Sequence, residues 1–327
     1  MVTVAVLDKF HPHIKAAIEA AVPAEWHTVF IEKATLAERV TAVRDADVAL
    51  VMAAPIAKEV VAAGQKLRFI QKLGAGVDHI DLDACRERGI GVARLHAGNS
   101  IPVAEHTVLL MLAVYRQLPQ IDRRTRAGTW DKETARGEHR QLLNKTIGLI
   151  GLGAVGKQVA KHLRGFDATV IYYDPVRPSA ELEQSLGVSY AEFDDLVRRS
   201  DIVSLHLPLL PETAGIINAE RIRAMKKGAV LINCARGGVV DEAALAAALK
   251  EGHLFGAGID TFASEPPVGS ELLVLENTVV TPHLAGATLD NFAGIVARAV
   301  ENAKAVLRGE PVAKTDEVLA VGKVAAV

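Results

Sequence analysis

Three side chains suited to acid–base and anion chemistry lie in the last third of the chain: Arg236, Glu265 and His283. Arg236 belongs to the stretch NCARGGVVDE, and a guanidinium can bind a carboxylate through two parallel N–H groups. His283 belongs to TPHLAGA, and an imidazole titrates near neutral pH and can pass a proton. Glu265 can hold such an imidazole and favour its charged form. Together they predict an acid, the group that orients it, and an anion clamp.

A second candidate site is the glycine pattern GLGAVG at 151–156, which follows the apolar run TIGLI and precedes a stretch of helical period. In this context Gly151 allows a tight turn, Gly153 lets backbone N–H groups approach a pyrophosphate, and Gly156 lets the helix pack closely. The N-terminus of the helix attracts the anion. The pattern predicts a dinucleotide site.

Asp174 ends the next apolar run, TVIYY, close to the spacing of ~20 residues expected for the acidic residue of such a site. A carboxylate there accepts hydrogen bonds from the 2′-hydroxyl of the adenosine ribose and repels a 2′-phosphate, so we expect NAD rather than NADP. Arg177 leaves one alternative open, because an arginine near this strand end can bind the phosphate of NADP. An exposed turn residue after Pro175 is the commoner role for such an arginine.

The elements that must position these residues form two series of short Val-, Ile- and Leu-rich runs alternating with helical patterns, which is typical of parallel sheets. The first series predicts strands at 2–7, 28–31, 47–52, 67–73 and 90–94, with helices near 12–21, 35–45, 57–63 and 81–88. The second predicts six strands at 146–150, 168–173, 202–207, 229–233, 255–260 and 278–281. Arg236, Glu265 and His283 then follow strand ends, where open α/β sheets bind ligands.

Two helices are expected to connect these series. Residues 101–118 are apolar almost all round, which predicts a connector buried between domains. A final helix at about 287–307 is long enough to cross back and pack on the first domain. We therefore predict an α/β chain with two doubly wound parallel-sheet domains, one of residues 1–99 plus 288–327 and one of residues 100–287.

Two regions show no clean pattern. Residues 123–140 are basic around Trp130 and predict a solvated loop or arm, with a dimer arm at the edge of the active site as the alternative. The tail after Gly309 is expected to be loosely held.

The composition excludes several classes of protein. The chain has 327 residues, is 50% hydrophobic and 23% charged, and carries a formal net charge of −2 without a dense basic stretch, so a nucleic-acid partner is not expected. Cys85 and Cys234 lie far apart and show no spacing typical of a disulfide framework or a metal site. The N-terminus lacks the pattern of a signal peptide, and the apolar run 108–115 is far shorter than the ~20 residues of a membrane span. We expect a cytoplasmic protein without metal or membrane partner.

The chain resembles the D-isomer-specific 2-hydroxyacid dehydrogenases, a family that includes phosphoglycerate dehydrogenase and hydroxypyruvate and glyoxylate reductases. The resemblance covers nearly the whole chain, through LGAGVDHIDLDA at 73–84, GNSIPVAEHTVLLML at 98–112, GLIGLGAVGK at 148–157, HLPLLPETAGIIN at 206–218, NCARGGVVDE at 233–242 and TPHLAGAT at 281–288. It implies a flavodoxin-like substrate domain, a Rossmann NAD-binding domain, and an active site of Arg236, Glu265 and His283 in the cleft between them.

The resemblance also implies residue roles. A small 2-keto or 2-hydroxy acid would bind through Arg236 and the backbone N–H groups of Ala75 and Gly76, with Asn99 as a further cleft residue, while His283 gives a proton to the keto oxygen. The implied NAD contacts are Gly151, Gly153, Val155, Gly156, Asp174, Pro208, Thr213, Cys234, Arg236, Asp260, His283 and Gly286. Cys234 would pack beside NAD and not act as a nucleophile. Members of the family usually form homodimers, which we expect here.

Two departures from phosphoglycerate dehydrogenases bear on the substrate. Where those enzymes carry an arginine for the substrate phosphate, this chain reads VMAA at 51–54, and Lys72 would only partly substitute for it. No regulatory domain is expected after residue 327. Both favour hydroxypyruvate or glyoxylate, and D-3-phosphoglycerate stays an alternative. Formate dehydrogenases carry Gln in place of Glu265, which disfavours that activity, and a NAD-sensing corepressor-like scaffold is a remoter alternative.

Overall fold

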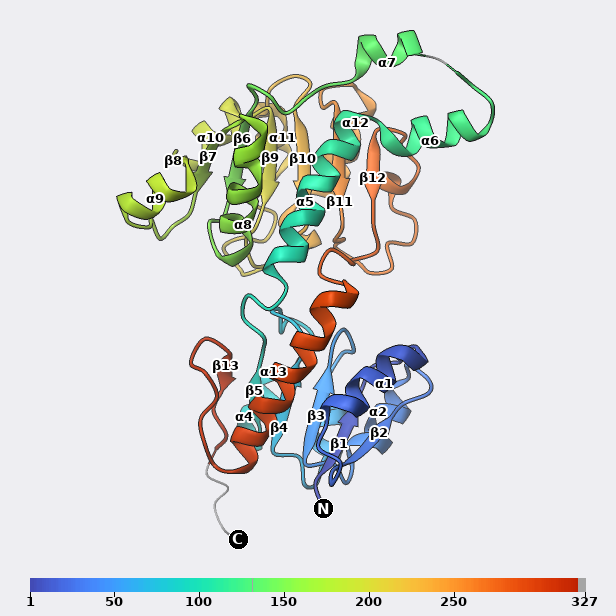
Figure 1. Cartoon of the computed structure of the whole chain (residues 1–327), viewed down its shortest axis with the longest axis vertical. Coiled ribbons are helices and arrows are strands. Elements are labelled where there is room, and N and C mark those ends of the chain that lie inside the picture. The colour runs from blue at the N-terminus through green and yellow to red at the C-terminus, as the bar shows by residue number, and fades with distance from the viewer. Residues whose placement is uncertain (131, 323–327) are drawn as a thin grey trace. The chain divides into compact units, whose positions relative to one another are not determined.

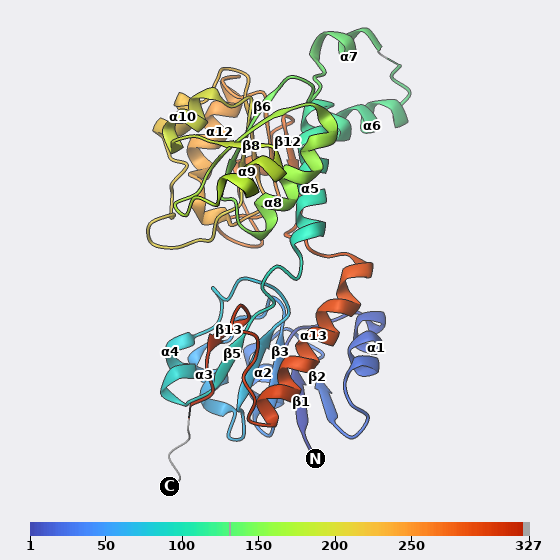
Figure 2. The ribbon, with the colours of Figure 1, turned by 60° about the vertical axis from the view of Figure 1, so that its left-hand side comes forward.

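A computed structural model describes residues 1–130 and 132–322. The chain divides into two compact units, which we call unit 1 (Met1–Asn99 with Ala287–Val327) and unit 2 (Ser100–Gly286). Each unit is a sheet with helices on both faces, as Figures 1 and 2 show. The prediction of two parallel-sheet α/β domains is therefore confirmed.

Unit 1 has the strand order β13-β5-β4-β3-β1-β2. Its parallel strands are β1 (Thr3–Val6), β2 (His27–Phe30), β3 (Val48–Val51), β4 (Phe69–Lys72) and β5 (Gly91–Ala93). Its helices are α1 (Pro12–Ala21), α2 (Leu36–Val43), α3 (Lys58–Ala63), α4 (Leu82–Glu87) and α13 (Leu289–Leu307). Without β13 the order is the 2-1-3-4-5 order of one class of doubly wound sheets.

Helix α13 belongs to unit 1 although it comes last among the helices. Phe292, Val296, Val300 and Ala303 recur at intervals of three and four residues, so they share one face of the helix. This face packs in one core with residues of α1 and of strands β1, β3 and β4. The sheet is thus covered by segments from both ends of the chain.

The expectation of a loosely held tail is wrong for the residues around β13 (Glu317–Leu319), which pairs antiparallel with β5. Asp316 precedes this strand and is fully buried. Its carboxylate pairs with the Arg298 guanidinium on α13 and accepts hydrogen bonds from the His96 backbone N–H (3.0 Å) and Asn302 Nδ2 (3.3 Å). Residues 323–327 of the predicted tail lie outside the described residues.

Unit 2 has the strand order β12-β11-β10-β9-β6-β7-β8, all parallel. The strands are β6 (Thr146–Ile150), β7 (Thr169–Tyr173), β8 (Val188–Tyr190), β9 (Ile202–Leu205), β10 (Val230–Asn233), β11 (Gly256–Ile259) and β12 (Thr278–Val280). Counted from β6, this is the 3-2-1-4-5-6 order of dinucleotide-binding sheets, extended by one strand. The prediction of six strands missed β8, whose three residues directly follow the helix-ending Gly187.

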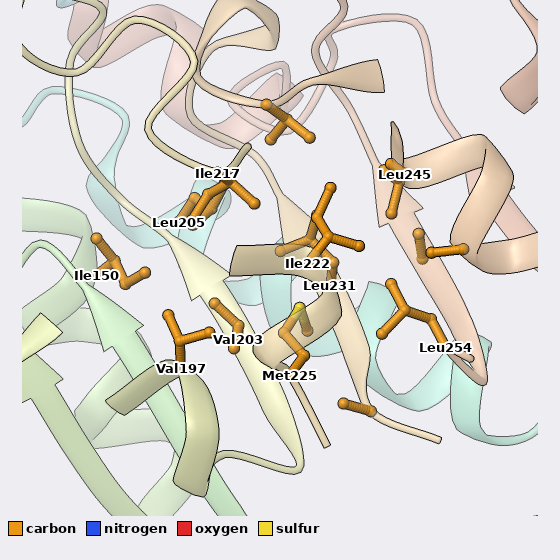
Figure 3. Close-up of a cluster of buried hydrophobic side chains, with 14 of the residues drawn as sticks. Ile150, Val197, Val203, Leu205, Ile217, Ile222, Met225, Leu231, Leu245 and Leu254 are labelled. Carbon is orange, nitrogen blue, oxygen red and sulfur yellow. The ribbon is translucent and has the colours of Figure 1, made fainter. Parts of the chain in front are cut away.

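The helices of unit 2 cover both faces of this sheet. They include α8 (Ala154–Leu163), α9 (Ala180–Leu186), α10 (Phe193–Arg199), α11 (Ala219–Ala224) and α12 (Glu242–Lys250). One core contains Val203, Leu231 and Leu245 and is drawn in Figure 3. The other forms beneath α8 and the connector helix α5 (Ser100–Tyr115). Leu110, Met111, Val114 and Tyr115 of α5 are buried there, so unit 2 itself accounts for much of the apolar character of this helix.

Residues 123–140, predicted as a solvated loop or arm, contain helical structure that the sequence did not reveal: α6 (Leu118–Arg126) and α7 (Lys132–Glu138). Helix α6 buries none of its residues. Ion pairs between neighbouring turns support both helices, Arg126 with Asp122 and Arg136 with Glu133. Because a helix without a buried face has no apolar stripe, hydrophobic periodicity could not reveal it.

Within residues 1–130 and 132–322, no helix has the length and apolar character needed to cross a membrane. The same residues hold no group of three or more His, Cys, Asp or Glu side chains placed to bind a metal ion.

We expect Asp316→Ala to lower the free energy of unfolding of unit 1 by ~3 kcal/mol, because it removes a buried carboxylate that pairs with Arg298 and accepts hydrogen bonds from the His96 N–H and from Asn302. Urea denaturation followed by circular dichroism measures the change. The control is Glu310→Ala, which breaks the exposed pair with Arg308 and should cost no more than ~0.5 kcal/mol. Equal effects of the two substitutions would contradict this role of Asp316.

Candidate active site

The three side chains proposed for chemistry follow neighbouring strands of unit 2. Asn233 at the end of β10 pairs in register with Ile259 at the end of β11, and Ile259 pairs with Val280 at the end of β12. The loops that carry Arg236, Glu265 and His283 therefore leave the same edge of the sheet. This is the edge at which open parallel sheets bind ligands.

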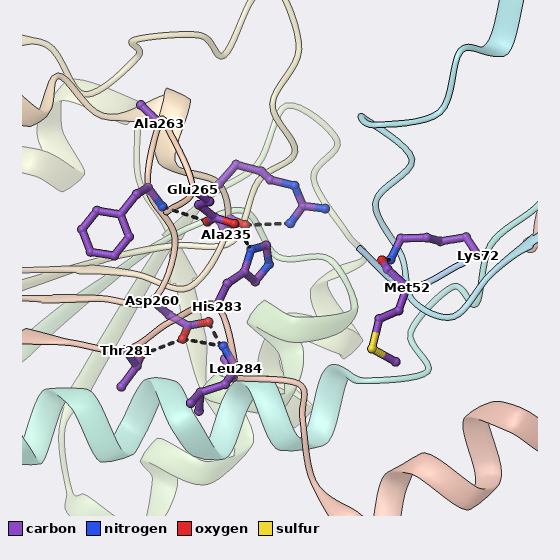
Figure 4. A network of polar contacts seen from close by, with 12 residues as sticks. Met52, Lys72, Ala235, Asp260, Ala263, Glu265, Thr281, His283 and Leu284 are labelled. Atoms are coloured by element: carbon purple, nitrogen blue, oxygen red, sulfur yellow. Dashed lines mark hydrogen bonds and ion pairs between the residues drawn. The ribbon is translucent and has the colours of Figure 1, made fainter. Parts of the chain in front are cut away.

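Glu265 and His283 form a direct pair, with 2.8 Å between Glu265 Oε2 and His283 Nδ1 (Figure 4). The second carboxylate oxygen, Oε1, accepts a hydrogen bond from the Phe262 backbone N–H at 3.0 Å. The carboxylate is thus held by its own loop while it engages the imidazole. Because Nδ1 is occupied by Glu265, the ring can present Nε2 to a substrate.

A buried carboxylate holds the turn that carries His283. His283 has a left-handed backbone with φ of 52°, which is uncommon for a residue other than glycine. Its backbone N–H donates to the Asp260 carbonyl at 2.8 Å. The Asp260 side chain accepts from the Thr281 hydroxyl (2.6 Å) and from the N–H groups of Leu284 (2.9 Å) and Ala285 (3.0 Å), as Figure 4 shows. Asp260 therefore positions His283 in this structure, and its contact with the nicotinamide stays a prediction.

His106 on α5 extends this network and was not singled out in the sequence. Its Nε2 lies 3.1 Å from the Thr281 hydroxyl oxygen. Because the single hydroxyl proton of Thr281 goes to Asp260, the oxygen must accept a hydrogen bond from His106. His106 lies in the motif GNSIPVAEHTVLLML at 98–112, but no spacing rule connects this motif with Thr281.

Asn233, a second missed residue, shapes the turn that carries Arg236. The buried Asn233 side chain donates from Nδ2 to the Arg236 carbonyl (2.9 Å) and accepts from the Ala235 N–H (3.0 Å). Arg236 Nη1 donates to the Ala235 carbonyl at 2.7 Å. The side-chain amide of Asn233 thus supplies both a donor and an acceptor to the turn. These bonds hold the backbone that carries Arg236, three residues after Asn233.

Gly237 lets the Arg236 turn pack against the Glu265 loop. A Cβ added at Gly237 would lie 1.8 Å from the carbonyl carbon of Phe262 and 2.1 Å from the nitrogen of Ala263, so a side chain cannot fit. The Ala263 N–H also donates to Glu242 Oε1 at 2.6 Å, which ties this loop to the start of α12. The backbones of the two loops are in direct contact as a result.

The glycine turn has the geometry of a pyrophosphate cradle. Gly151 has φ of +99°, and a Cβ there would lie 2.4 Å from the His206 carbonyl oxygen. A Cβ on Gly156 would lie 2.2 Å from the Gly151 carbonyl oxygen. A Cβ on Gly153, at the N-cap of α8, would meet nothing within 4 Å, and Val155 follows in the first turn of the helix. Two glycines thus allow close packing, and the third leaves the N-terminus of the helix open to an anion.

Asp174 lies directly after β7 and is tied to the glycine turn. Its Oδ2 accepts a hydrogen bond from the Leu152 N–H at 2.8 Å, and its Oδ1 accepts from the Val176 N–H at 2.9 Å. Each carboxylate oxygen retains a further lone pair for a ribose hydroxyl. The turn, the helix N-terminus and this carboxylate fit a bound NAD.

The other predicted cofactor residues of unit 2 lie in loops at this sheet. The Thr213 hydroxyl donates to the Pro208 carbonyl at 2.6 Å and accepts from the Leu210 N–H at 2.7 Å, so it closes that loop. Burial raises the pKa of the Cys234 thiol to about 12, which keeps it protonated and without nucleophilic character. Gly286 directly follows Ala285, whose N–H donates to the Asp260 carboxylate. Their contacts with a cofactor stay predictions.

The substrate residues expected outside this sheet belong to unit 1. Lys72 ends β4, is buried, and donates from Nζ to the Met52 carbonyl (Figure 4). Ala75 and Gly76 lie in the half-buried loop that follows β4, and Asn99 is the last residue of the first segment of the unit. That these residues bind the substrate stays a prediction.

Comparison with known proteins identifies the family. Residues 108–285 match the model of the "D-isomer specific 2-hydroxyacid dehydrogenase, NAD binding domain". The chain belongs to this family. The matched residues 108–285 lie within unit 2, and the match confirms the resemblance and NAD as the cofactor.

Relatives with curated names and solved structures cover most of the chain. A D-3-phosphoglycerate dehydrogenase of Methanocaldococcus jannaschii is 39% identical over 95% of this chain, which spans 58% of that protein. A glyoxylate reductase of Thermofilum pendens is 41% identical over 85% of this chain and 84% of its own length. The structure of the NAD-dependent formate dehydrogenase of Staphylococcus aureus in complex with NAD superposes with a TM-score of 0.87 at 27% identity, covering 98% of this chain and 100% of the other. The chain spans little more than half the length of the phosphoglycerate dehydrogenase.

We expect Gly237→Ala to destabilise unit 2 by ~2 kcal/mol, because the added methyl group overlaps backbone atoms that cannot move without breaking the Ala263 hydrogen bond. Thermal and urea unfolding measure the change. Gly238→Ala is the matched control, since a Cβ there would meet only the flexible Leu209 side chain, 3.1 Å away. If both variants unfold at the same urea concentration, the close approach at Gly237 is not needed.

Proposed function

We propose that this chain is an NAD-dependent oxidoreductase that interconverts a 2-keto acid and a D-2-hydroxy acid. The proposal rests on the Glu265–His283 pair. The loops that carry these two residues leave the sheet at the same edge as the dinucleotide turn. An acid–base group beside a nicotinamide is what reduction of a carbonyl requires. Unit 2, predicted as residues 100–287, is the cofactor domain, and residues 1–99 with 288–327 are proposed as the substrate domain.

The roles of the residues follow from their contacts. When bound, NADH supplies the hydride. His283 donates the proton on Nε2 to the keto oxygen, while Glu265 accepts from Nδ1–H and holds the imidazolium in this orientation. In the oxidative direction the neutral imidazole takes that proton back. Arg236 binds the carboxylate of the substrate through its planar N–H groups, which orients the carbonyl carbon.

The loop after β3 favours an unphosphorylated substrate such as hydroxypyruvate or glyoxylate. The backbone N–H groups of Met52, Ala53 and Ala54 all donate to the Asp8 carboxylate, at 2.5 to 2.8 Å. These donors are therefore occupied. The Asp8 carboxylate also adds negative charge to this loop, whereas binding a substrate phosphate would need positive charge. Lys72 donates to the Met52 carbonyl, which draws its ammonium toward the backbone. D-3-phosphoglycerate is the alternative substrate.

We also propose a cytoplasmic homodimer. Both cysteines are free and buried, as is usual in a reducing compartment. Ile101, Glu105 and Leu109 form an exposed stripe on α5, with Ile101 and Leu109 53% and 51% exposed. Leu118 and Trp130, which follow this helix in the sequence, are also exposed. Exposed apolar patches of this kind commonly mark contact surfaces between proteins.

We expect His283→Ala to lower kcat for reduction of the 2-keto acid by at least ~100-fold, the usual contribution of a positioned general acid. The dissociation constant of NADH should change little, because the glycine turn and Asp174 remain. Stopped-flow absorbance at 340 nm measures turnover, and fluorescence titration measures NADH binding.

The substrate panel for this experiment is glyoxylate, hydroxypyruvate, pyruvate and phosphohydroxypyruvate with the unchanged chain. We expect the highest kcat/KM with glyoxylate or hydroxypyruvate. NADH binding without turnover of any of the four would favour a NAD-sensing scaffold. Turnover unaffected in the His283 variant would exclude this residue as the acid.

We expect the chain to have the mass of a dimer in light scattering at micromolar concentration, and Leu109→Asp to shift it to a monomer because it replaces one of the two apolar residues of the stripe by a second carboxylate next to Glu105. Leu36→Asp is the control, since this exposed leucine lies in the first turn of α2 in unit 1, where an acidic residue is tolerated. A monomeric mass for the unchanged chain would refute the homodimer.

A further inference from the structure

Arg177, the residue that left NADP open as an alternative, is held by a neighbouring carboxylate. Its Nε lies 2.7 Å from Glu183 Oε1 and its Nη2 lies 3.0 Å from Glu183 Oε2, so the guanidinium engages both oxygens. The guanidinium carbon also lies 5.0 Å from the centre of the Tyr190 ring. One forked edge of the guanidinium, formed by Nε and Nη2, is therefore directed at Glu183.

Glu183 is itself fixed in place. It lies on α9, and its Oε1 accepts a hydrogen bond from the Tyr172 hydroxyl on β7. The Glu183 side chain is 13% exposed, whereas that of Arg177 is 59% exposed. Hydrogen bonds from Arg177 and Tyr172 lower the pKa of Glu183 to about 2, so the carboxylate is ionised at any working pH. An ordered carboxylate with three contacts differs from an ordinary surface ion pair, whose partners move freely.

The position of this pair connects it with cofactor choice. Arg177 is three residues beyond Asp174, which closes the dinucleotide turn through the Leu152 N–H. An arginine near this strand end is the residue type that accepts the 2′-phosphate of NADP. We propose that Glu183 is a specificity-determining residue that withholds Arg177 from a 2′-phosphate and so reinforces the exclusion of NADP by Asp174.

The inference rests on the proposed ribose contact of Asp174 and not on the identity of the substrate. Glu183 acts through Arg177. Its two oxygens occupy the Nε and Nη2 edge of the guanidinium and offset its positive charge, so a 2′-phosphate gains less by binding to Arg177. Removing the carboxylate should therefore help NADPH only while Arg177 is present.

The experiment measures the dissociation constants of NADPH and NADH by fluorescence titration without any keto acid. Asp174→Ser is the background, because the native carboxylate repels a 2′-phosphate directly. Adding Glu183→Gln should tighten NADPH binding about tenfold, the effect of one recovered charge-assisted contact, and change NADH binding less than about twofold. Glutamine keeps an acceptor for Tyr172, and Glu183→Ala serves as a second variant with the same expected direction.

Arg177→Ala tests whether Glu183 acts through the guanidinium. In that background Glu183→Gln should no longer tighten NADPH binding, because no guanidinium is left to release. If the gain persists without Arg177, or if the ratio of the NADPH and NADH constants does not change in either Glu183 variant, the proposal is wrong. Since the readout is binding alone, a failure of the proposed catalytic activity would appear separately, as absent turnover with intact NADH binding.

Discussion

The buried carboxylate of Asp260 is the interaction on which the candidate active site depends. Removing a charge from water costs several kcal/mol unless hydrogen bonds replace the lost hydration. Here the Thr281 hydroxyl and the N–H groups of Leu284 and Ala285 supply those bonds. The same bonds fix the turn in which His283 adopts its left-handed backbone, and His106 supports them from α5. The orientation of the imidazole toward Glu265 follows from this network.

Close approach of backbone to backbone is the second constraint. Gly151 lies against the His206 carbonyl, Gly156 against the Gly151 carbonyl, and Gly237 against Phe262. The first two contacts shape the dinucleotide turn, and the third joins the loops that carry Arg236 and Glu265. Because all of them arise at the carboxyl edge of one parallel sheet, the cofactor turn and the acid–base pair are held by the same rigid element.

Charge at the end of β7 shows how one motif acquires its specificity. In the proposed site the Asp174 carboxylate binds a ribose hydroxyl, and Arg177, three residues further along the chain, carries the opposite charge. Taken alone, the two residues favour different cofactors, and the sequence leaves both possibilities open. The structure shows that Glu183, held by Tyr172, pairs with the arginine. If our proposal holds, cofactor preference depends on a residue that does not itself contact the cofactor.

The sequence by itself determined the features that are encoded locally: the alternation of strands and helices, the glycine turn with Asp174, and the strand ends that carry Arg236, Glu265 and His283. Periodicity reports which face of an element is buried, so it located most of the strands. It missed β8, which buries one residue, β13, which buries none, and α6, which buries none. Only the tertiary structure decided which distant groups meet. His106 and Thr281 are 175 residues apart, and the close approach of Gly237 to Phe262 and Ala263 likewise follows from how the loops pack. Hydrogen bonds and steric contacts depend on distances in space, which no local pattern specifies.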